Sequence, residues 1–295
     1  MNSTGFKSGF VNILGNPNVG KSTLMNALIG RNLAITTSKA QTTRHRILGI
    51  LNGDNYQIVF SDTPGILEPR YKLQESMLKS AAGALEDADI LVIVTAVDDD
   101  TLNRDPFFDR IINCEAPKIV VVNKVDLSSQ PAVEALIAKW EKLLPEAPVI
   151  PISAKHDFNL NTLFRSITEM LPEGHPYFPD DQLSDRFERF FAAEIIREKI
   201  LLNYSKEIPY SVEVEIESYT EEPGLTRIGA LIHIERDSQK GIIIGHKGSM
   251  LKRTGTMARK SLEEFLGTKV FLEMRVKVSG EWRQKASMLK RFGYQ

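Results

Sequence analysis

Residues Gly15 to Ser22 read Gly-Asn-Pro-Asn-Val-Gly-Lys-Ser, a complete G-x-x-x-x-G-K-[ST] motif. The motif follows the apolar run Phe10–Leu14 and precedes a helical stretch over Lys21–Leu28, which is the strand–loop–helix setting of a phosphate-binding P-loop. Backbone N–H groups of such a loop wrap phosphate oxygens, and the helix N-terminus adds a favourable dipole. The sequence therefore predicts a nucleotide site with these residues at the phosphates: Gly15, Asn16, Pro17, Asn18, Val19, Gly20, Lys21, Ser22 and Thr23.

A Mg²⁺ site is expected beside the phosphates. The Ser22 hydroxyl is one expected ligand, and Asp62, at the end of an apolar run, would support the metal through a coordinated water. Between them, residues 41–44 form a polar stretch that we expect to be a mobile loop. This loop would add a threonine to the metal in the triphosphate state, and Thr43 is preferred over Thr42.

Residues 62–65 read Asp-Thr-Pro-Gly, the D-x-x-G pattern whose glycine N–H senses the γ-phosphate. Ras-like GTPases carry a glutamine directly after this glycine to orient the attacking water, but this chain has Ile66 there, which can neither donate nor accept a hydrogen bond. Backbone, metal, bound water or a group from elsewhere must then position the water. The residues expected to respond to the γ-phosphate are Thr42, Thr43, Asp62, Thr63, Pro64, Gly65 and Ile66.

Two further motifs select the base. Residues 123–126 read Asn-Lys-Val-Asp, the N-K-x-D pattern of GTPases. Asp126 can accept hydrogen bonds from guanine N1–H and the 2-amino group, which adenine does not offer, while Lys124 would lay its aliphatic stem across the base. Residues 153–155 resemble the S-A-K motif, whose alanine N–H meets guanine O6. The expected guanine contacts are Asn123, Lys124, Asp126, Ser153, Ala154 and Lys155.

The chain before residue 175 alternates apolar runs with helical stretches, which indicates a mostly parallel sheet with helices on both faces. Strands are expected over Phe10–Leu14, Arg46–Leu51, Tyr56–Ser61, Ile90–Ala96, Lys118–Val122 and Val149–Ile152. Helices are expected over Lys21–Leu28, Leu73–Leu85, Phe107–Asn113, Ala132–Leu144 and Leu160–Met170. Prolines cluster after this point, so we expect a GTP-binding domain at 1–174, a linker at 175–184 and a second domain at 185–295.

The second domain is expected to be a smaller α+β unit. Asp185 is expected to cap a long helix whose apolar face would be buried, with Arg189 and Arg197 turned away from it. A hairpin of Ser211–Tyr219 and Arg227–Asp237 is expected to follow. The expected apolar face of the helix consists of Phe187, Phe191, Ile195 and Leu202.

A nucleic-acid site is expected around residues 245–248, which read Gly-His-Lys-Gly. The order helix, hairpin, G-x-x-G loop, helix and strand (Lys269–Val278) is that of a KH fold, whose G-x-x-G loop clamps a nucleic-acid backbone. From Gly245 onward the chain has twelve Lys and Arg and four Glu, a formal charge of +8. Because the net charge of the whole chain is −1, the remainder carries −9. Such asymmetry indicates a polyanionic partner. The expected RNA contacts are Gly245, His246, Lys247, Gly248, Lys252 and Arg253.

Composition sets broader limits. Hydrophobic residues at 42% and charged residues at 25% are typical of a globular protein. The single cysteine, Cys114, excludes an internal disulfide framework and is expected to be a small buried hydrophobe with no assigned role. No apolar run reaches the roughly 18 residues that span a bilayer, and Met1–Phe10 lacks the apolar core of a signal peptide. A cytoplasmic location is therefore expected.

Several stretches together resemble the bacterial Era family of ribosome-assembly GTPases over nearly the whole chain, from Gly9 to Tyr294. Residues 39–46, KAQTTRHR, are the stretch most specific to this family, because the stretch is long and nucleotide binding in general does not require it. The resemblance implies an α/β P-loop GTPase domain followed by a smaller α+β KH-type (type II) RNA-binding domain. The matching stretches are Gly15–Leu24, Lys39–Arg46, Asp62–Gly65, Glu194–Lys199, Pro209–Glu217 and Gly245–Gly248.

Membership would imply a slow, Mg²⁺-dependent GTPase that binds GTP and GDP, binds the 3′ end of 16S rRNA and assists assembly of the 30S ribosomal subunit. Related GTPases with a hydrophobic residue at the position of Ile66 and an asparagine at that of Asn18 can recruit K⁺ beside the phosphates, so K⁺ at Asn18 is a hypothesis. Peripheral attachment to the inner face of the cell membrane stays open.

Two other functions compete with this one. A tandem-G-domain GTPase of the Der type would need two P-loops, and the sequence contains one. A nucleotide-dependent interaction or signalling module with negligible hydrolysis, acting at the membrane surface, is left open by Ile66.

Overall fold

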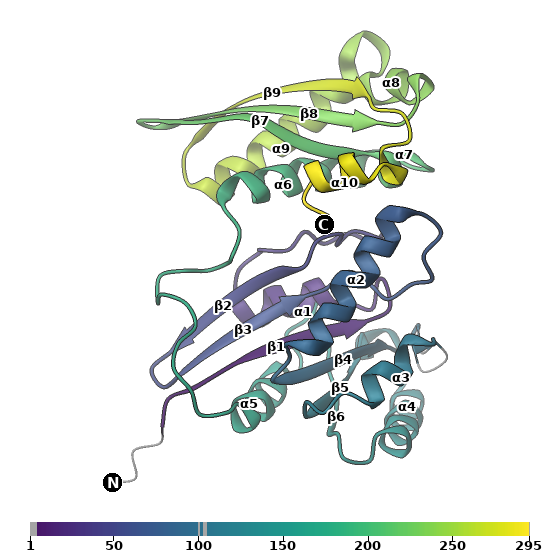
Figure 1. Cartoon of the computed structure of the whole chain (residues 1–295), viewed down its shortest axis with the longest axis vertical. Helices are drawn as coiled ribbons and strands as arrows, with labels where there is room; N and C mark the ends of the chain where they lie inside the picture. The colour runs from purple at the N-terminus through teal and green to yellow at the C-terminus, as the bar shows by residue number, and fades with distance from the viewer. Residues whose placement is uncertain (1–4, 100, 103–104, 295) are drawn as a thin grey trace. The chain divides into compact units, whose positions relative to one another are not determined.

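The computed structural model describes residues 5–99, 101–102 and 105–294. They form two compact units that part between Asp185 and Arg186 (Figure 1). The first unit contains a six-stranded sheet and the second a three-stranded sheet. Within the described part of the chain, no helix combines the length and the apolar character needed to cross a membrane.

The sheet of the first unit has the strand order β2-β3-β1-β4-β5-β6. All neighbours pair in parallel except β2 and β3, which are antiparallel. Every residue of β4 is buried, as its unbroken apolar sequence requires of a strand covered on both faces. The strands are β1 (Lys7–Gly15), β2 (Ile47–Gly53), β3 (Tyr56–Asp62), β4 (Ile90–Ala96), β5 (Lys118–Asn123) and β6 (Val149–Pro151).

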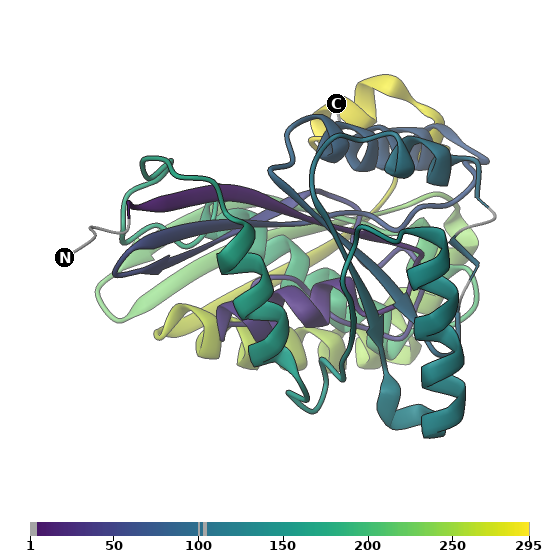
Figure 2. The same ribbon diagram turned by 90° about the horizontal axis from the view of Figure 1, so that it is seen from below.

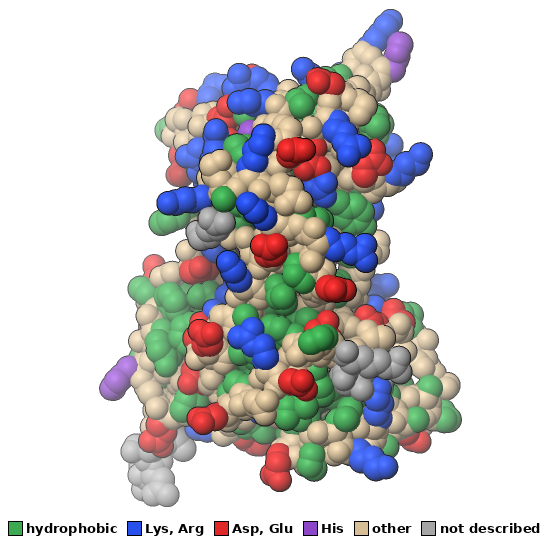
Figure 3. All heavy atoms as spheres, turned by 45° about the vertical axis from the view of Figure 1, so that its right-hand side comes forward, with side chains coloured by type: hydrophobic (Ala, Val, Ile, Leu, Met, Phe, Trp, Pro, Cys, Tyr) green, Lys and Arg blue, Asp and Glu red, His purple; other side chains and the backbone are tan. Residues whose placement is uncertain are grey.

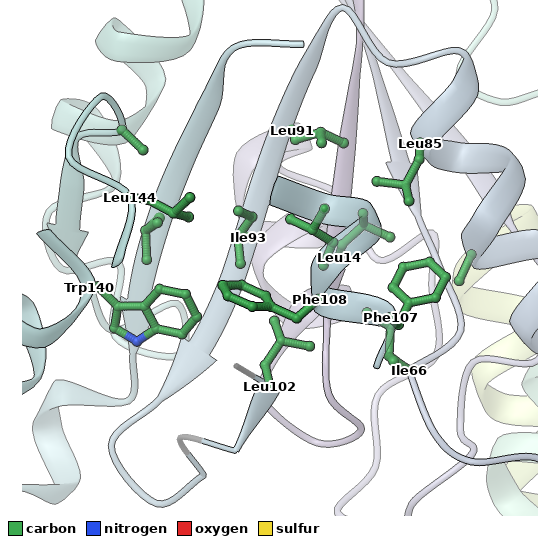
Figure 4. Close-up of a cluster of buried hydrophobic side chains, with 14 of the residues drawn as sticks. Leu14, Ile66, Leu85, Leu91, Ile93, Leu102, Phe107, Phe108, Trp140 and Leu144 are labelled. Atoms are coloured by element: carbon green, nitrogen blue, oxygen red, sulfur yellow. The ribbon is translucent and has the colours of Figure 1, made fainter. Parts of the chain in front are cut away.

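Helices cover both faces of this sheet, as the sequence predicts. One buried cluster joins residues of α2, α3 and α4 to residues of β1, β4 and β5, with Trp140 fully buried within it (Figure 4). Helices α1 and α5 lie on the opposite face from α2 (Figure 2). The helices are α1 (Lys21–Ile29), α2 (Lys72–Glu86), α3 (Phe107–Ile112), α4 (Gln130–Leu143) and α5 (Leu160–Met170).

The segment 175–184, expected to be a linker, is hydrogen-bonded along the first unit. The Ser8 hydroxyl donates to the carbonyl of His175 at 2.7 Å, and the Gln57 amide donates to the carbonyl of Phe178 at 2.8 Å. Near its end, the hydroxyl of Ser184 donates to the carbonyl of Leu48 at 2.6 Å. Strands β1, β2 and β3 thus each hold a different part of this segment.

The second unit has the helix–hairpin–loop–helix–strand order of a KH fold, as predicted. Strands β7 and β8 form an antiparallel hairpin, and β9 pairs in parallel with β8. Strand β8 ends at Ile234 rather than at the expected Asp237, which begins α8. The elements are α6 (Glu188–Asn203), α7 (Ile208–Ser211), β7 (Glu213–Glu222), β8 (Leu225–Ile234), α8 (Asp237–Ile244), α9 (Ser249–Leu266), β9 (Lys269–Val278) and α10 (Ala286–Arg291).

Two expectations for α6 are wrong. The helix begins at Glu188, and Asp185 accepts a hydrogen bond from the Leu48 N–H at 3.2 Å instead of capping the helix. The expected buried face is wrong in part: Phe187 is 86% exposed and Leu202 is 53% exposed. Phe191 is buried and Ile195 packs against the core, as expected, and Arg189 is exposed.

The physical reason is a buried ion pair. Arg197, expected to face solvent, is fully buried, and its Nε donates to Oε1 of Glu194 at 2.8 Å. Glu194 lies three residues earlier on the same side of the helix and is buried with it. A guanidinium can enter a protein core only when a carboxylate accompanies it, so this face contains charged as well as apolar side chains.

Candidate functional site

A pocket of about 730 Å³ at the carboxyl end of the parallel strands brings the predicted motifs of the first unit together. Parallel α/β sheets bind ligands at this edge. The expected site residues that line it are Pro17, Asn18, Gly20, Lys21, Ser22, Thr23, Thr42, Thr43, Gly65, Asn123, Lys124, Asp126, Ser153, Ala154 and Lys155. The expected residues that do not line it are Gly15, Asn16, Val19, Asp62, Thr63, Pro64 and Ile66.

The P-loop has a backbone that only glycine permits at its second conserved glycine. Gly20 has φ +99°, and a β-carbon there would lie 2.3 Å from Nδ2 of Asn123. The same asparagine nitrogen donates to the carbonyl of Val19 at 2.8 Å. The loop is therefore fixed against the base-recognition segment by a contact that leaves no room for a side chain at Gly20.

Lys21 is buried at the phosphate end of the pocket. Its ammonium donates to the carbonyls of Gly15 and Asn16, at 3.0 and 2.8 Å. Burial lowers the pKa of Lys21 to about 8, although the negative charges of Asp62 and Asp99 act in the opposite direction. A phosphate group bound next to Lys21 would add negative charge beside its ammonium and so favour the protonated form.

Three oxygen-bearing side chains meet next to Lys21. The Ser22 hydroxyl donates to Oδ2 of Asp62 at 2.6 Å, and the Thr43 hydroxyl donates to the same oxygen at 3.2 Å. Ser22 and Thr43 are themselves 2.8 Å apart. The neighbouring Thr42 instead bonds within its own loop, to the carbonyl of Lys39 at 2.6 Å. Thr43 is thus the threonine that reaches the serine and the carboxylate.

This group of oxygens suits a hard cation. Oδ1 of Asp62 is buried without a hydrogen-bond partner among the described residues, and burial raises the pKa of this carboxyl. Mg²⁺ prefers oxygen ligands and keeps several waters or phosphate oxygens in its shell. The described residues contain no cluster of His, Cys, Asp and Glu that could hold a metal alone, so hydroxyls and phosphate oxygens would complete the coordination.

The base end of the pocket is organised by Asn123. Its Oδ1 accepts a hydrogen bond from the Ala154 N–H at 3.0 Å, while its Nδ2 reaches the P-loop. The side chain therefore connects the P-loop, the N-K-x-D segment and the S-A-K segment. The Ala154 N–H, expected to meet guanine O6, is engaged by the protein here, and its contact with the base stays a prediction.

Asp126 is positioned and kept ionised by its neighbours. The Ser153 hydroxyl donates to Oδ1 of Asp126 at 2.6 Å, and His156 Nε2 lies 3.7 Å from Oδ2. The hydrogen bond from Ser153 is the main reason that the pKa of Asp126 is lowered. The side chain is 27% exposed and lines the pocket, so its carboxylate can accept hydrogen bonds from a bound base.

Ile66 does not face the pocket. Its side chain is 2% exposed and belongs to the buried cluster of Leu102, Phe107 and Phe108 (Figure 4). Its N–H donates to the carbonyl of Gly15 at 3.1 Å, which joins this segment to the P-loop. Among the described residues, therefore, no side chain directly after Gly65 is available to hold a water at the γ-phosphate.

The motifs miss several lining residues. One comes from the loop after β4, where Asp98 lines the pocket; its neighbour Asp99 does not line it but accepts a hydrogen bond from the amide of Asn16 at 3.2 Å. The signal that could have found them is their place after a buried parallel strand, at the edge where the other motifs lie. The other missed lining residues are Ile35, Thr36, Thr37, Ser38, Gln41, Leu67 and Leu127.

A second candidate site lies in the second unit. The G-x-x-G residues form a tight turn between α8 and α9, with positive φ at Gly245, Lys247 and Gly248. Beside the turn is a groove of about 390 Å³. Of the expected RNA contacts, Gly248 and Lys252 line it, His246 and Lys247 are exposed at the turn, and Arg253 is exposed outside the groove.

The groove is lined by both apolar and basic side chains, a combination that suits unstacked bases and a phosphate backbone. The unexpected lining residues are Leu251, Gly255, Thr256, Arg259, Leu272 and Met274. Lys and Arg side chains crowd the visible face of the second unit, while Asp and Glu are more frequent over the first (Figure 3).

Comparison with known proteins gives consistent matches for both units. A family model described as a 50S ribosome-binding GTPase matches residues 10–124, and a KH domain model matches residues 207–283. A GTPase Era of Geotalea daltonii is 46% identical over 292 residues, which is 98% of each chain. A GTPase Era of Staphylococcus haemolyticus is 42% identical over 293 residues, covering 99% of this chain and 98% of its own.

Two solved structures match along almost the whole chain. One is Era in complex with MgGDPNP and nucleotides 1506–1542 of 16S ribosomal RNA, at 40% identity and a TM-score of 0.94. The other is an Aquifex aeolicus Era variant bound to GDP and AlF₄⁻, with the same identity and TM-score. Each covers 98% of this chain and 99% of its own.

Proposed function

This chain belongs to the Era family of GTPases, and on that premise we propose that it hydrolyses GTP in the 730 Å³ pocket, binds the 3′ end of 16S rRNA through its second unit and assists assembly of the 30S subunit. The observation that carries the proposal is the pocket itself. One cavity is lined by a P-loop lysine, by a serine and a threonine whose hydroxyls bind Asp62, and by a base-recognition carboxylate. These are the parts that phosphoryl transfer from a guanine nucleotide requires.

The roles of the individual residues follow from their positions. Lys21 would bind the β- and γ-phosphates, and Asp126 would read the guanine edge. Mg²⁺ would be held by Ser22, Thr43 and Asp62, where it would neutralise charge that develops on the phosphates.

Hydrolysis must proceed without a glutamine after Gly65. Because Ile66 is part of the core, the attacking water would be placed by backbone groups such as the Gly65 N–H, by the metal, by another bound water or by a group from elsewhere. This arrangement supports a slow intrinsic turnover.

K⁺ is a second proposed cation. Asn18 has a left-handed backbone (φ +64°) and lines the pocket together with Lys21 and Ser22. Its carbonyl and amide oxygens are ligands that K⁺ accepts. GTPase rates in KCl and NaCl at matched ionic strength test the idea, and equal rates would rule K⁺ out.

RNA binding is assigned to the groove beside Gly248. Gly248 has φ +79° and nothing within 4 Å of a notional β-carbon, so a phosphate can approach its backbone closely. Lys252 and Arg259 line the same groove and offer positive charge.

The domain limits we propose are 1–174 for the GTP-binding domain, 175–184 for the linker and 185–295 for the KH-type domain. A cytoplasmic location accompanies this function, and sedimentation with anionic vesicles would test peripheral membrane attachment.

One experiment tests the RNA-binding part of the proposal and its dependence on the nucleotide. A short RNA from the 3′ end of 16S rRNA and a scrambled RNA are titrated with the full chain, in GDP and in GDPNP, across several salt concentrations. We expect the authentic RNA to bind more tightly, most of all with GDPNP. Equal binding of both RNAs that vanishes with salt would reduce the second unit to an electrostatic patch and overturn the RNA assignment.

The competing function, a nucleotide-dependent module with negligible hydrolysis, gains support from the burial of Ile66. Multiple-turnover phosphate release decides between the two. Release that RNA or 30S subunits stimulate supports the GTPase switch, whereas release that does not exceed one equivalent supports the module.

A further inference from the structure

The loop after β4 is built into the nucleotide pocket, although no nucleotide-binding motif includes it. Ala96 and Asp99 exchange backbone hydrogen bonds of 3.2 and 3.0 Å, so the loop is a closed turn. The Val97 N–H donates to the carbonyl of Asn123 at 3.2 Å, which joins the turn directly to the base-recognition segment. Asp98 is therefore presented to the pocket from a backbone that cannot shift independently of that segment.

Asp98 holds Lys124 with both carboxylate oxygens. The Lys124 ammonium lies 3.0 Å from Oδ1 and 2.9 Å from Oδ2 of Asp98. The lysine side chain is 25% exposed and the aspartate side chain is 52% exposed, and both residues line the pocket. Lys124 has a left-handed backbone (φ +61°) and directly follows Asn123, the last residue of β5.

This pair is poorly suited to stabilising the fold. A half-exposed ion pair between flexible side chains contributes little to folding, because water screens it and ordering the lysine costs entropy. It is well suited to orienting a ligand contact, because a free lysine stem has four rotatable carbons and samples many directions. Fixing the ammonium at one end fixes the course of the stem between it and the backbone.

We propose that Asp98 is a positioning residue for the guanine base, which fixes the Lys124 ammonium so that the lysine stem lies across the face of the base. The inference rests on the proposed GTP site and deepens it. The base lies away from the reacting phosphates, so Asp98 contributes equally to binding of substrate, transition state and product. Its loss therefore weakens GTP and GDP alike and leaves the chemical step unchanged.

The test uses the full chain with Mg²⁺, and measures Kd for GDP and GDPNP together with KM and kcat for GTP. Asp98→Ala is expected to weaken both nucleotides about 3- to 5-fold, the range that an exposed ion pair allows, and to raise KM with kcat unchanged. Asp98→Asn should behave like the alanine variant, and Asp98→Glu should keep most of the affinity. Asp54→Ala, an exposed aspartate in the turn between β2 and β3, is the matched control and should change nothing.

A double-mutant cycle shows whether Asp98 acts through Lys124. Lys124→Ala should weaken binding, and adding Asp98→Ala to it should have no further effect. Additive losses, or a fall in kcat at unchanged KM, would overturn the inference. Unchanged affinity in Asp98→Ala while the wild-type chain binds GDP would also overturn it. Failure of the wild-type chain to bind GDP would instead overturn the proposed function.

Discussion

The Ser22 hydroxyl donates to Oδ2 of Asp62 at 2.6 Å, while Oδ1 of the same carboxylate is buried without a hydrogen-bond partner among the described residues. One oxygen of Asp62 thus positions a metal ligand, and the other is left for a coordinated water. A buried polar atom without a partner destabilises the free protein. Binding of a hydrated cation would relieve that cost.

Magnesium dependence should therefore weaken on acidification. Burial raises the pKa of Asp62, so the carboxylate that the metal needs is lost at a higher pH than the value of about 3.9 typical of an exposed aspartate. The effect of pH on folding of the metal-free protein has the opposite direction. There the Asp62 carboxyl stabilises the folded state at low pH, and this contribution is lost as pH rises through the raised pKa. GDPNP affinity measured with and without Mg²⁺, between about pH 8 and pH 5, checks the first effect. Asp62→Asn should weaken the Mg²⁺ effect and make it independent of pH over this range, because the titrating carboxyl is gone; a pH dependence that survives unchanged in this variant would contradict the assignment.

Nucleotide binding should take up a proton above about pH 8. The pKa of Lys21 is lowered by burial from 10.5 in the unfolded chain to about 8, so its amine is partly neutral at that pH and above. Phosphates favour the ammonium and draw the proton back. Calorimetric heats of GDP binding should then depend on the buffer's ionisation enthalpy. Lys21→Arg, which keeps its charge, should bind nucleotide without proton uptake, and buffer-independent heats for the wild-type chain would refute the idea.

The same lysine affects folding. Without nucleotide, the free energy of unfolding should rise between about pH 8 and pH 10.5, because the unfolded chain binds a proton there that the folded chain lacks.

Gly20→Ala should destabilise the first unit by about 2–4 kcal/mol, because a β-carbon would lie 2.3 Å from Nδ2 of Asn123 in a backbone with φ +99°. The matched control is Gly30→Ala. Gly30 also has a positive φ, +73°, but nothing lies within 4 Å of its notional β-carbon, so the cost there should be about 1 kcal/mol. Thermal unfolding of both variants measures the difference, and equal losses would mean that the Asn123 contact does not constrain the P-loop.

Asp126→Asn should reduce the preference for guanine over adenine nucleotides by at least about 10-fold. The carboxylate accepts twice from the guanine edge, and an amide presents a donor to one of those positions, which leaves a polar group unpaired. Competition of GDP and of ADP with a labelled guanine nucleotide for the pocket measures the ratio of their affinities. A ratio equal to that of the wild-type chain would show that Asp126 does not read the base.

Gly248→Asp should weaken RNA binding about 10-fold or more without changing GDP affinity, since the new carboxylate repels phosphate at the turn. Gly267→Asp is the control: its φ is +67° and its notional β-carbon is also free of contacts, but it caps the far end of α9 and does not line the groove. Electrophoretic or anisotropy titration with the 3′-end RNA compares the two. Equal losses would point to a general charge effect, and the groove would lose its assignment.

The motifs predicted which residues meet at the pocket, because phosphate and guanine chemistry dictates residue types at the ends of particular strands. The alternation of apolar runs predicted six strands close to where they lie, including β2, which pairs antiparallel. The apolar pattern alone does not give the direction of β2, but the short connection from Gly53 to Tyr56 does, because strands joined by so tight a turn pair antiparallel.

The rest could not be predicted, for reasons that α6 and Asp98 illustrate. Apolar spacing identified part of the buried face of α6 but placed Arg197 in solvent, since an arginine counts as a surface residue until Glu194 is known to be buried beside it. Asp98 belongs to no phosphate or base motif, and its role depends on a contact with Lys124, which lies 26 positions later in the chain. Such pairings between distant positions come from the assembled sheet.

The buried Ile66 side chain also bears on how this enzyme could evolve. A glutamine at that position would bring an amide into the space now shared with Phe107 and Leu102, where an unpaired polar group costs about 1–3 kcal/mol. A single substitution would therefore lower stability before it could offer a new way to hold water. Any lineage that acquired a side-chain-positioned water would first have to remodel the packing between the segment after β3 and helix α3. The way in which the attacking water is positioned therefore depends on the packing of the hydrophobic core. Substitutions confined to the active site are not enough to change it.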